Sequence, residues 1–561
     1  MSTLDWIVLF GTLVSIVAYG LYRSRGSDTV DRFLLAGKTM PWYAMALSIM
    51  ATQASAVTFI STTGQSYVDG MRFVQFYFGL PIAMVILCAT VVPVFHRAKV
   101  FTAYEYLEQR FDAKTRTLAS VIFLCQRGLS AGLTLYAPAI VLSAILGWPD
   151  RVTIALMGVT VVTYTSLGGV KAVTWSDVQQ MCIIFFGLVA SLVTVITLLP
   201  RSVSFSDALF LAGAAGRLNA VTTNFDWNDR FTLWSGLIGG TFLFLSYFGC
   251  DQSQVQRYLT GSSIAQSRLS LIFNAVAKIP MQFFILFIGA MVFVFYLFVA
   301  PPLLFERSNL ARIQDASAYQ PLNERYERAF NGRRQAAEDV IAAHHAHDAA
   351  GEQRGAAAYR AAQRDMDAAR SEAAKLVETT GGEPGFSDTN YIFLSFVTRY
   401  LPVGLVGLVI AVMFAATMSA SAGEINSLAT VTMVDLYRRY FRRGASDHHY
   451  LMASRWATIF WGAYAIASAG FGKKLGSLIV AVNVVGSLFY GSLLGVFALA
   501  FFFRRVRGTA AFVGLLAGEA VVFWAFLFTG ISFLWYNVIG CVVVVATAVA
   551  ITYGGGERAE I

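Results

Sequence analysis

The chain has 561 residues, of which 57% are hydrophobic and 13% are charged, and its formal net charge is +9. Soluble domains have roughly 45–50% apolar and 25% charged residues, so this composition excludes an ordinary soluble protein and indicates an integral membrane protein. The cations fall mainly in loops predicted on the cytoplasmic side, as the positive-inside rule describes, and we therefore expect no nucleic-acid partner. The five cysteines lie in apolar segments without CxxC spacing, which argues against disulfides and zinc sites.

Apolar stretches long enough to cross a hydrocarbon core of about 30 Å predict an all-α polytopic protein with 13 membrane-spanning helices. They lie near residues 4–22, 41–66, 73–95, 117–147, 152–168, 175–199, 231–250, 269–300, 402–434, 452–470, 476–502, 509–530 and 533–553. The first has Asp5 at its start and Arg23 behind it, the reverse of a secretory signal's basic start. We expect a multi-pass protein of the inner or plasma membrane, with the N-terminus outside and the C-terminus in the cytoplasm.

Residues 306–388 interrupt the membrane pattern and are rich in Ala, Arg, Glu and Gln. This composition predicts a solvated helical insertion on the extracytoplasmic face. A docking surface for a partner protein is the alternative. The patch of His344, His345, His347 and Asp348 has the spacing of a metal cluster on one helix face, but an ordinary polar helix is the simpler interpretation.

The second predicted span, 41–66, is unusually polar in its second half. The polar residues there are Thr52, Gln53, Ser55, Thr58, Ser61, Thr62, Thr63 and Gln65. Polar groups are costly in lipid and usually face a protein cavity. A helix interrupted near the middle of this span would expose carbonyl groups that bind a cation and amide groups that attract an anion. The sequence therefore predicts a broken helix at a binding site.

Two cations lie inside other apolar segments, Arg127 and Lys278. A buried cation needs an anionic partner unless its side chain snorkels to an interface. From Lys278, snorkelling would have to cover about 15 Å along the helix axis. We therefore expect Lys278 to face a cavity.

Three motifs resemble the sodium:solute symporter family, in an order and at spacings that cover nearly the whole chain apart from 306–388. They are YTSLGGVKAVTWSDVQQ at 164–180, DQSQVQRYL at 251–259 and PVGLVGLVIAVMFAATMSASAGEINSLATVTMVDLY at 402–437. The resemblance implies a single transporter domain over 1–561 with a leucine-transporter-like fold. This fold contains two five-helix inverted repeats, here 41–199 and 231–502, with one helix before them and two after. It also implies sodium-coupled import of a small solute by alternating access, with sodium as the coupling ion and the lipid bilayer as the surroundings.

The family's sodium site can be carried over by position. It falls on the backbone carbonyls of the broken span and on the 402–437 helix, at Ala51, Ala54, Ala416, Ser419 and Ala420. Family members usually offer two adjacent hydroxyl groups, and position 420 has none. Some members bind a second sodium with residues that match Asp177, Ser419, Ala422 and Gly423; because two of those hydroxyls are missing, we expect one sodium and no other metal.

Glu424 lies one turn beyond the expected sodium site, and Asp177 is expected at a similar depth. The 24 uncharged residues from 400 to 423 would span about 36 Å as a helix, which would bring Glu424 to the inner boundary of the membrane. We therefore consider two roles for Glu424, a solvated interfacial acid or a group that lines a sodium exit path beside Asp177.

The family's substrate pocket carries over to Thr58, Tyr77, Leu80, Phe244 and Lys278, and we add Tyr247 at the start of YFGCDQSQVQRYLTG. A sugar would leave several groups unpaired here, each at a cost of ~1–3 kcal/mol. One cation among aromatic and aliphatic groups suits a small organic anion. SAVTFIS at 55–61 and LTLYAPAIVLS at 133–143 also resemble the branch of the family that carries monocarboxylates, vitamins and iodide.

Several alternatives remain open at this level. A sugar or sialic acid, an amino acid such as proline, and an inorganic anion are alternative substrates. A channel and a transporter-like sensor are alternatives from other functional classes. An enzyme is not expected, because no nucleophile and base or metal constellation has catalytic spacing.

Overall fold

The computed structural model describes residues 1–24, 29–382, 386–470 and 478–554. It is 83% helical, and no β-strand occurs among these residues. The α-helices are α1 Thr3–Arg23, α2 Val30–Leu35, α3 Trp42–Gln53, α4 Ala56–Asp69, α5 Leu80–Ala89, α6 Val91–Ala98, α7 Ala103–Arg110, α8 Ala113–Leu146, α9 Asp150–Thr197, α10 Phe205–Ala214, α11 Gly240–Gly249, α12 Gln252–Leu259, α13 Ile264–Phe298, α14 Arg307–Ile313, α15 Tyr319–His345, α16 Ala349–Thr379, α17 Ile392–Tyr400, α18 Leu405–Val431, α19 Asp447–Ala469, α20 Leu478–Phe502, α21 Gly508–Phe528 and α22 Phe533–Gly554. Short 3-10 or π segments are η1 Ala36–Lys38, η2 Gly70–Tyr77, η3 Ser235–Gly239, η4 Thr389–Tyr391 and η5 Thr432–Phe441.

Nine helices in the described part of the chain are long and apolar enough to cross a membrane. One of them, α9, has 48 residues and would be about 72 Å long if straight, more than twice the thickness of the hydrocarbon core. Gly169 interrupts it with φ 58° and ψ −163°, a conformation that favours glycine. The predicted spans 152–168 and 175–199 are thus the two parts of α9. The total of 13 spans stays a prediction.

Helix α18 lies in the middle of the bundle and packs against α1, α8, α9 and α19. Its sequence is dominated by small residues, which allow neighbouring helices to approach closely, and nearly all of its side chains are buried. Its first turn is capped by α1, because the Asp5 carboxylate accepts hydrogen bonds from the N–H groups of Gly404 (2.6 Å) and Gly407 (3.1 Å). These contacts fix α18 against the first helix of the chain.

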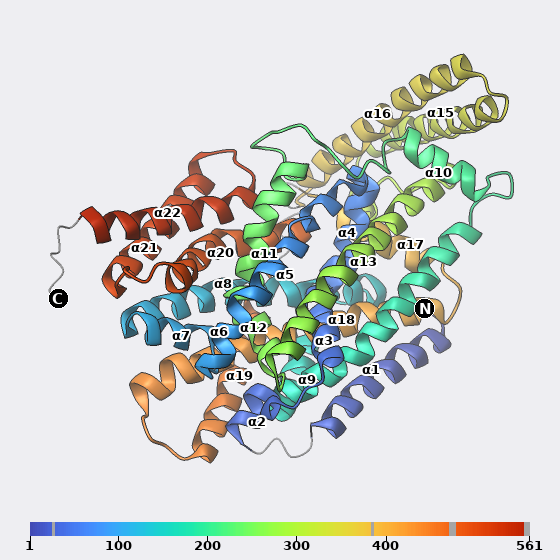
Figure 1. The fold of residues 1–561 in the computed structure, drawn as a ribbon. Coiled ribbons are helices and arrows are strands. Elements are labelled where there is room, and N and C mark those ends of the chain that lie inside the picture. Colours follow the sequence, from blue (N-terminus) through green and yellow to red (C-terminus); the bar gives the residue numbers. More distant parts are fainter. Residues whose placement is uncertain (25–28, 383–385, 471–477, 555–561) are drawn as a thin grey trace.

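Most of residues 307–379 are helical, and α15 and α16 form an antiparallel hairpin (Figure 1). The hairpin projects from the end of the bundle where the N-terminus lies. His344 bonds to Glu352 and stacks on Phe210, whereas His345 bonds to Asp207. The histidines therefore have separate partners, and no group of three metal-ligating side chains occurs within the ranges given above.

Candidate functional site

The second predicted span is broken, as its polar sequence indicated. Helix α3 ends at Gln53, Ala54 leaves helical geometry with φ −92° and ψ 59°, and α4 begins after Ser55. The Ser55 side chain makes no capping hydrogen bond to α4. The break therefore presents the Ala54 carbonyl at the end of one half-helix and uncapped amide groups at the start of the other.

Ser419 and Asp177 meet deep in the bundle beside α3. The Ser419 hydroxyl donates to Asp177 Oδ1, while Asp177 Oδ2 accepts from Ser48 Oγ at 2.5 Å. Ser48 lies one turn before Ala51 on α3, so this serine, the aspartate and Ser419 join α3, α9 and α18. Asp177 is fully buried in this structure.

Arg257 of α12 completes the surroundings of Asp177. Its Nη1 lies 3.0 Å from Asp177 Oδ2 and 2.5 Å from Ser48 Oγ. A Cβ atom on Gly423 would lie only 2.2 Å from Arg257 Nη2, so a larger residue at this position of α18 would force the end of the Arg257 side chain to shift. Asp177 is thus held by an ion pair and two hydroxyl groups.

Two of the helices that meet at Asp177, α3 and α18, also carry the residues expected to bind sodium. Ala51 and Ala54 lie at the end of α3, and Ala416, Ser419 and Ala420 lie on α18, which packs against α3 and α4. Backbone carbonyls and one serine hydroxyl are hard oxygen ligands, which suit an alkali cation. Ala420 offers no side-chain oxygen; the nearby negative charge comes from Asp177.

A cavity of about 100 Å³ opens beside the break. Its lining includes the predicted residues Thr58, Tyr77, Phe244 and Tyr247, and also Ala420 and Glu424. The sequence reasoning did not assign the other lining residues to the pocket: Thr52, Gln53, Ser55, Phe76, Arg127, Thr134, Leu243, Ile479, Val482, Asn483 and Tyr490. Of the sodium candidates, Ala420 lines the cavity, and Ala54 lies at the break between the lining residues Gln53 and Ser55.

Arg127 is the cation that lines this cavity, and it has two acidic partners. Its Nη1 donates to Glu424 Oε1 at 2.9 Å, and its Nη2 donates to Asp251 Oδ2 and to the Tyr490 hydroxyl (2.8 Å). The expectation that Arg127 needs an anionic partner is confirmed. The three charged groups sum to −1 when all are ionised.

Glu424 is not a solvated interfacial acid, so that interpretation is wrong. It is 5% exposed, and its Oε1 also lies near the hydroxyls of Ser130 (3.3 Å) and Thr134 (3.4 Å). Its Oε2 is buried and has no hydrogen-bond partner in the described part of the protein. The helical run continues from Leu405 through η5 to Phe441, 37 residues in all, so Glu424 lies near its middle rather than at its end.

Lys278 is fully buried on α13 but does not line the cavity. Its Nζ lies 5.9 Å from the centre of the Tyr77 ring, and Tyr77 does line it. Nζ has no hydrogen-bond partner among the described residues. The structure therefore places Lys278 next to a wall of the cavity.

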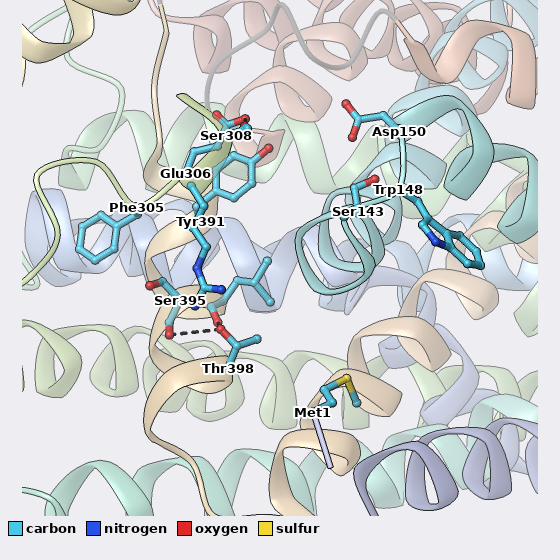
Figure 2. A pocket seen from close by; sticks show the side chains of 13 residues that line it. Met1, Ser143, Trp148, Asp150, Phe305, Glu306, Ser308, Tyr391, Ser395 and Thr398 are labelled. Carbon is cyan, nitrogen blue, oxygen red and sulfur yellow. Dashed lines mark hydrogen bonds between the residues drawn. The ribbon is translucent and has the colours of Figure 1, made fainter. Parts of the chain in front are cut away.

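A second, larger cavity of about 450 Å³ lies at the end of the bundle near the N-terminus. Figure 2 shows Ser143, Trp148 and Asp150 on one side of it and Glu306, Tyr391 and Ser395 on the other. None of the predicted site residues lines this cavity.

The sequence model of the sodium:solute symporter family matches residues 33–309 and 376–518. The chain belongs to this family. It is a sodium-coupled solute symporter, a multi-pass membrane transporter and not an enzyme. The unmatched residues between the two segments fall within the predicted insertion 306–388.

Among its relatives, sodium-coupled monocarboxylate transporter 1 of Homo sapiens is 29% identical over 523 residues, which cover 93% of this chain and 72% of the relative. The sodium-dependent multivitamin transporter of Oryctolagus cuniculus is 28% identical over 93% of this chain and 70% of its own. The sodium/sialic acid symporter NanT of Aliivibrio fischeri is 26% identical over 97% of this chain and 92% of its own.

The fold also resembles a solved structure, the substrate-bound outward-open state of a Na+-coupled sialic acid symporter. The TM-score is 0.75 at 24% identity, and the match covers 98% of each chain. This similarity supports a leucine-transporter-like fold.

Proposed function

We propose that this symporter imports a small organic solute with a carboxylate group through the cavity at the α3–α4 break. The observation that supports this most is that Ala54 and Ser55 bring the sodium candidates and the cavity lining together. A carboxylate beside a bound sodium would favour binding of both, which is the simplest physical basis for symport.

The carboxylate would bind at the start of α4. The first N–H groups of a helix lack helical acceptors, and the helix dipole attracts negative charge to them. Ser55 and Thr58 line the cavity at this end of α4. The named solutes of two relatives, monocarboxylates and sialic acid, both carry a carboxylate, which supports this assignment.

The size and the walls of the cavity favour a small solute. Its volume of about 100 Å³ is below the roughly 300–1,000 Å³ of sites for drug-sized ligands. Phe76, Tyr77, Phe244 and Tyr247 offer aromatic surface for an apolar body. A short monocarboxylate fits this description better than a sugar.

Glu424 favours a solute with a hydrogen-bond donor. Arg127 is already shared by Glu424 and Asp251, so a solute carboxylate next to it would face two like charges. The free Oε2 of Glu424 can instead accept a hydrogen bond from a hydroxyl or amino group of the solute. We therefore favour a hydroxy or amino acid over an unsubstituted acid.

Sodium would bind to the carbonyl oxygens of Ala51, Ala54 and Ala416 and to the Ser419 hydroxyl. Asp177, in contact with Ser419, would supply negative charge near the ion. A sodium exit past Asp177 stays a proposal, and it requires the Arg257 ion pair to open.

A larger polar carboxylate, such as sialic acid, is the second candidate. It is favoured by three polar side chains in the cavity lining, those of Gln53, Thr134 and Asn483. These groups would pair with hydroxyl groups of such a solute if the cavity widens during transport.

Uptake into proteoliposomes tests the proposal. We expect radiolabelled lactate to accumulate when sodium is high outside, and to accumulate much less when potassium replaces sodium. Propionate, biotin, sialic acid and glucose would be compared under the same gradient. Transport of glucose without transport of any carboxylate would overturn the proposed substrate class.

A further inference from the structure

A cavity of about 370 Å³ separates the α15–α16 hairpin from the transporter core. The core contributes Tyr67 of α4, Arg217 after α10 and Phe293 of α13 to its lining. The hairpin contributes Tyr326, Arg333, Gln363, Met366, Asp367, Arg370, Ser371 and Ala374, and the segment that follows contributes Phe386, Ser387 and Asp388. No residue is shared with the transport cavity at the α3–α4 break.

Arg333 is buried in this cavity without an acidic partner. It is 1% exposed, and it donates to the amide oxygen of Gln363 (2.8 Å) and to the carbonyl of Tyr296 (2.6 Å). Its Nε is buried and has no hydrogen-bond partner in the described ranges. Both of its hydrogen-bond acceptors among the described residues are thus neutral.

Arg217 lines the same cavity from the core side and is half-buried. Its guanidinium donates to the Val68 carbonyl and lies 4.4 Å from the centre of the Phe293 ring. Its Nε is also buried without a partner, and no carboxylate within the described residues lies within ion-pair distance of it. Asp69, the residue that follows Val68, lies 3.8 Å from Arg72 and also interacts electrostatically with Arg217.

The acids of the cavity do not balance these charges. Asp388 is held by Arg370 through two hydrogen bonds of 2.8 and 2.9 Å, so this pair is neutral. Asp367 is exposed and accepts from Gln363 at 2.9 Å. Among the described residues that line the cavity, three guanidinium groups therefore face two carboxylates.

We propose that this cavity binds a small anion, a carboxylate or an inorganic oxyanion, between Arg217 and Arg333. A guanidinium group presents N–H donors in a planar fork that matches such anions. A buried cation is unfavourable unless a counter-charge reaches it. The anion would connect the hairpin to α4, the helix that carries the break at the transport site.

Binding of radiolabelled sulfate and of radiolabelled acetate to the purified full-length protein tests this proposal. The measurement is made in sodium-free potassium buffer, which suppresses sodium-dependent binding at the transport cavity. We expect saturable binding of at least one anion; sulfate alone would identify an inorganic oxyanion site, and acetate would identify a carboxylate site.

Two variants locate the binding. Arg217→Gln removes one of the two guanidinium groups proposed to bind the anion. Ala374→Glu places a carboxylate in the cavity, and because Ala374 is half-exposed, this change should have little effect on folding. Each should weaken binding about tenfold or more, the effect of losing one charge-assisted hydrogen bond. Arg325→Gln, on the same hairpin but paired with Glu372 outside this cavity, should bind like the wild type.

The proposal is overturned if neither anion binds saturably, or if both variants bind with wild-type affinity. Neither result would bear on the proposed transport function, because sodium-driven uptake is measured separately. Conversely, a failure to transport carboxylates would leave sulfate binding at this cavity unaffected.

Discussion

Replacement of Glu424 by glutamine tests how the symporter recognises its solute. The two side chains are nearly equal in size, so the change removes the negative charge with little effect on packing. Arg127 keeps Asp251 and Tyr490 as partners, and the cluster changes from a net charge of −1 to a neutral pair. The bundle should therefore remain folded.

The expected magnitude follows from the free Oε2 of Glu424. A hydrogen bond from a solute hydroxyl to a charged acceptor contributes about 1.5–3 kcal/mol. Its loss should lower kcat/KM about 10- to 100-fold for lactate. Propionate has the same carbon chain without the hydroxyl, so its kcat/KM should change little.

Sodium-driven uptake of the two acids into proteoliposomes gives this comparison directly. Glu519→Gln is the matched control, because Glu519 also lies within a predicted span but outside the transport cavity. Equal losses for lactate and propionate in Glu424→Gln would refute recognition of the hydroxyl by Glu424. Unchanged uptake of both would remove Glu424 from the solute site altogether.

Three further predictions concern stability. Arg127→Gln leaves two buried carboxylates without their cation and should lower the free energy of unfolding by about 3–5 kcal/mol. The measurement is a lower Tm in detergent. Arg360→Gln is the control and should keep the wild-type Tm, because Arg360 is exposed. Gly64→Ala places a Cβ 2.0 Å from the Thr389 carbonyl oxygen and should release η4 from α4. Limited proteolysis should then cut the chain faster at η4. Gly11→Ala is the control, because nothing lies within 4 Å of a Cβ at that position. Burial acts to raise the pKa of Asp207, but hydrogen bonds from Ser204 and His345 outweigh it and lower the pKa. A lowered pKa contributes stability that is present above the unfolded value of about 3.9 and is lost as the pH falls through the folded value. Hydrogen exchange in α15 should therefore be faster in Asp207→Asn than in the wild type at pH 6, and the difference should shrink as the pH falls below about 3.9.

Local sequence patterns predicted the features that depend on neighbouring residues. The polar half of 41–66 indicated the break at Ala54, because polar groups in lipid need an internal cavity. The composition of 306–388 indicated helices, and α14, α15 and α16 lie in this range; their place on the extracytoplasmic face stays a prediction. The motif order indicated the family, which the sequence comparison confirmed.

Contacts between distant segments were not predictable in the same way. Arg127 and Glu424 are 297 positions apart, and nothing near either residue identifies the other. The solvated interpretation of Glu424 failed because the local sequence does not show that Arg127, Ser130 and Thr134 lie against its carboxylate. Lys278 was singled out because it is a cation in an apolar segment, but burial alone does not determine whether a side chain reaches a cavity or lies behind its wall.

The most direct test of the proposed site is the sodium dependence of lactate uptake in Ser419→Ala. The matched control is Ser421→Ala on the same helix, because the Ser421 hydroxyl is buried, does not line the transport cavity and has no hydrogen-bond partner among the described residues. If Ser419 ligates the coupling ion, its removal should raise the sodium concentration for half-maximal uptake about tenfold or more, as expected for one lost ligand to a charged group. Ser421→Ala should match the wild type. The same sodium dependence in all three proteins would contradict a sodium site at Ser419 beside the α3–α4 break.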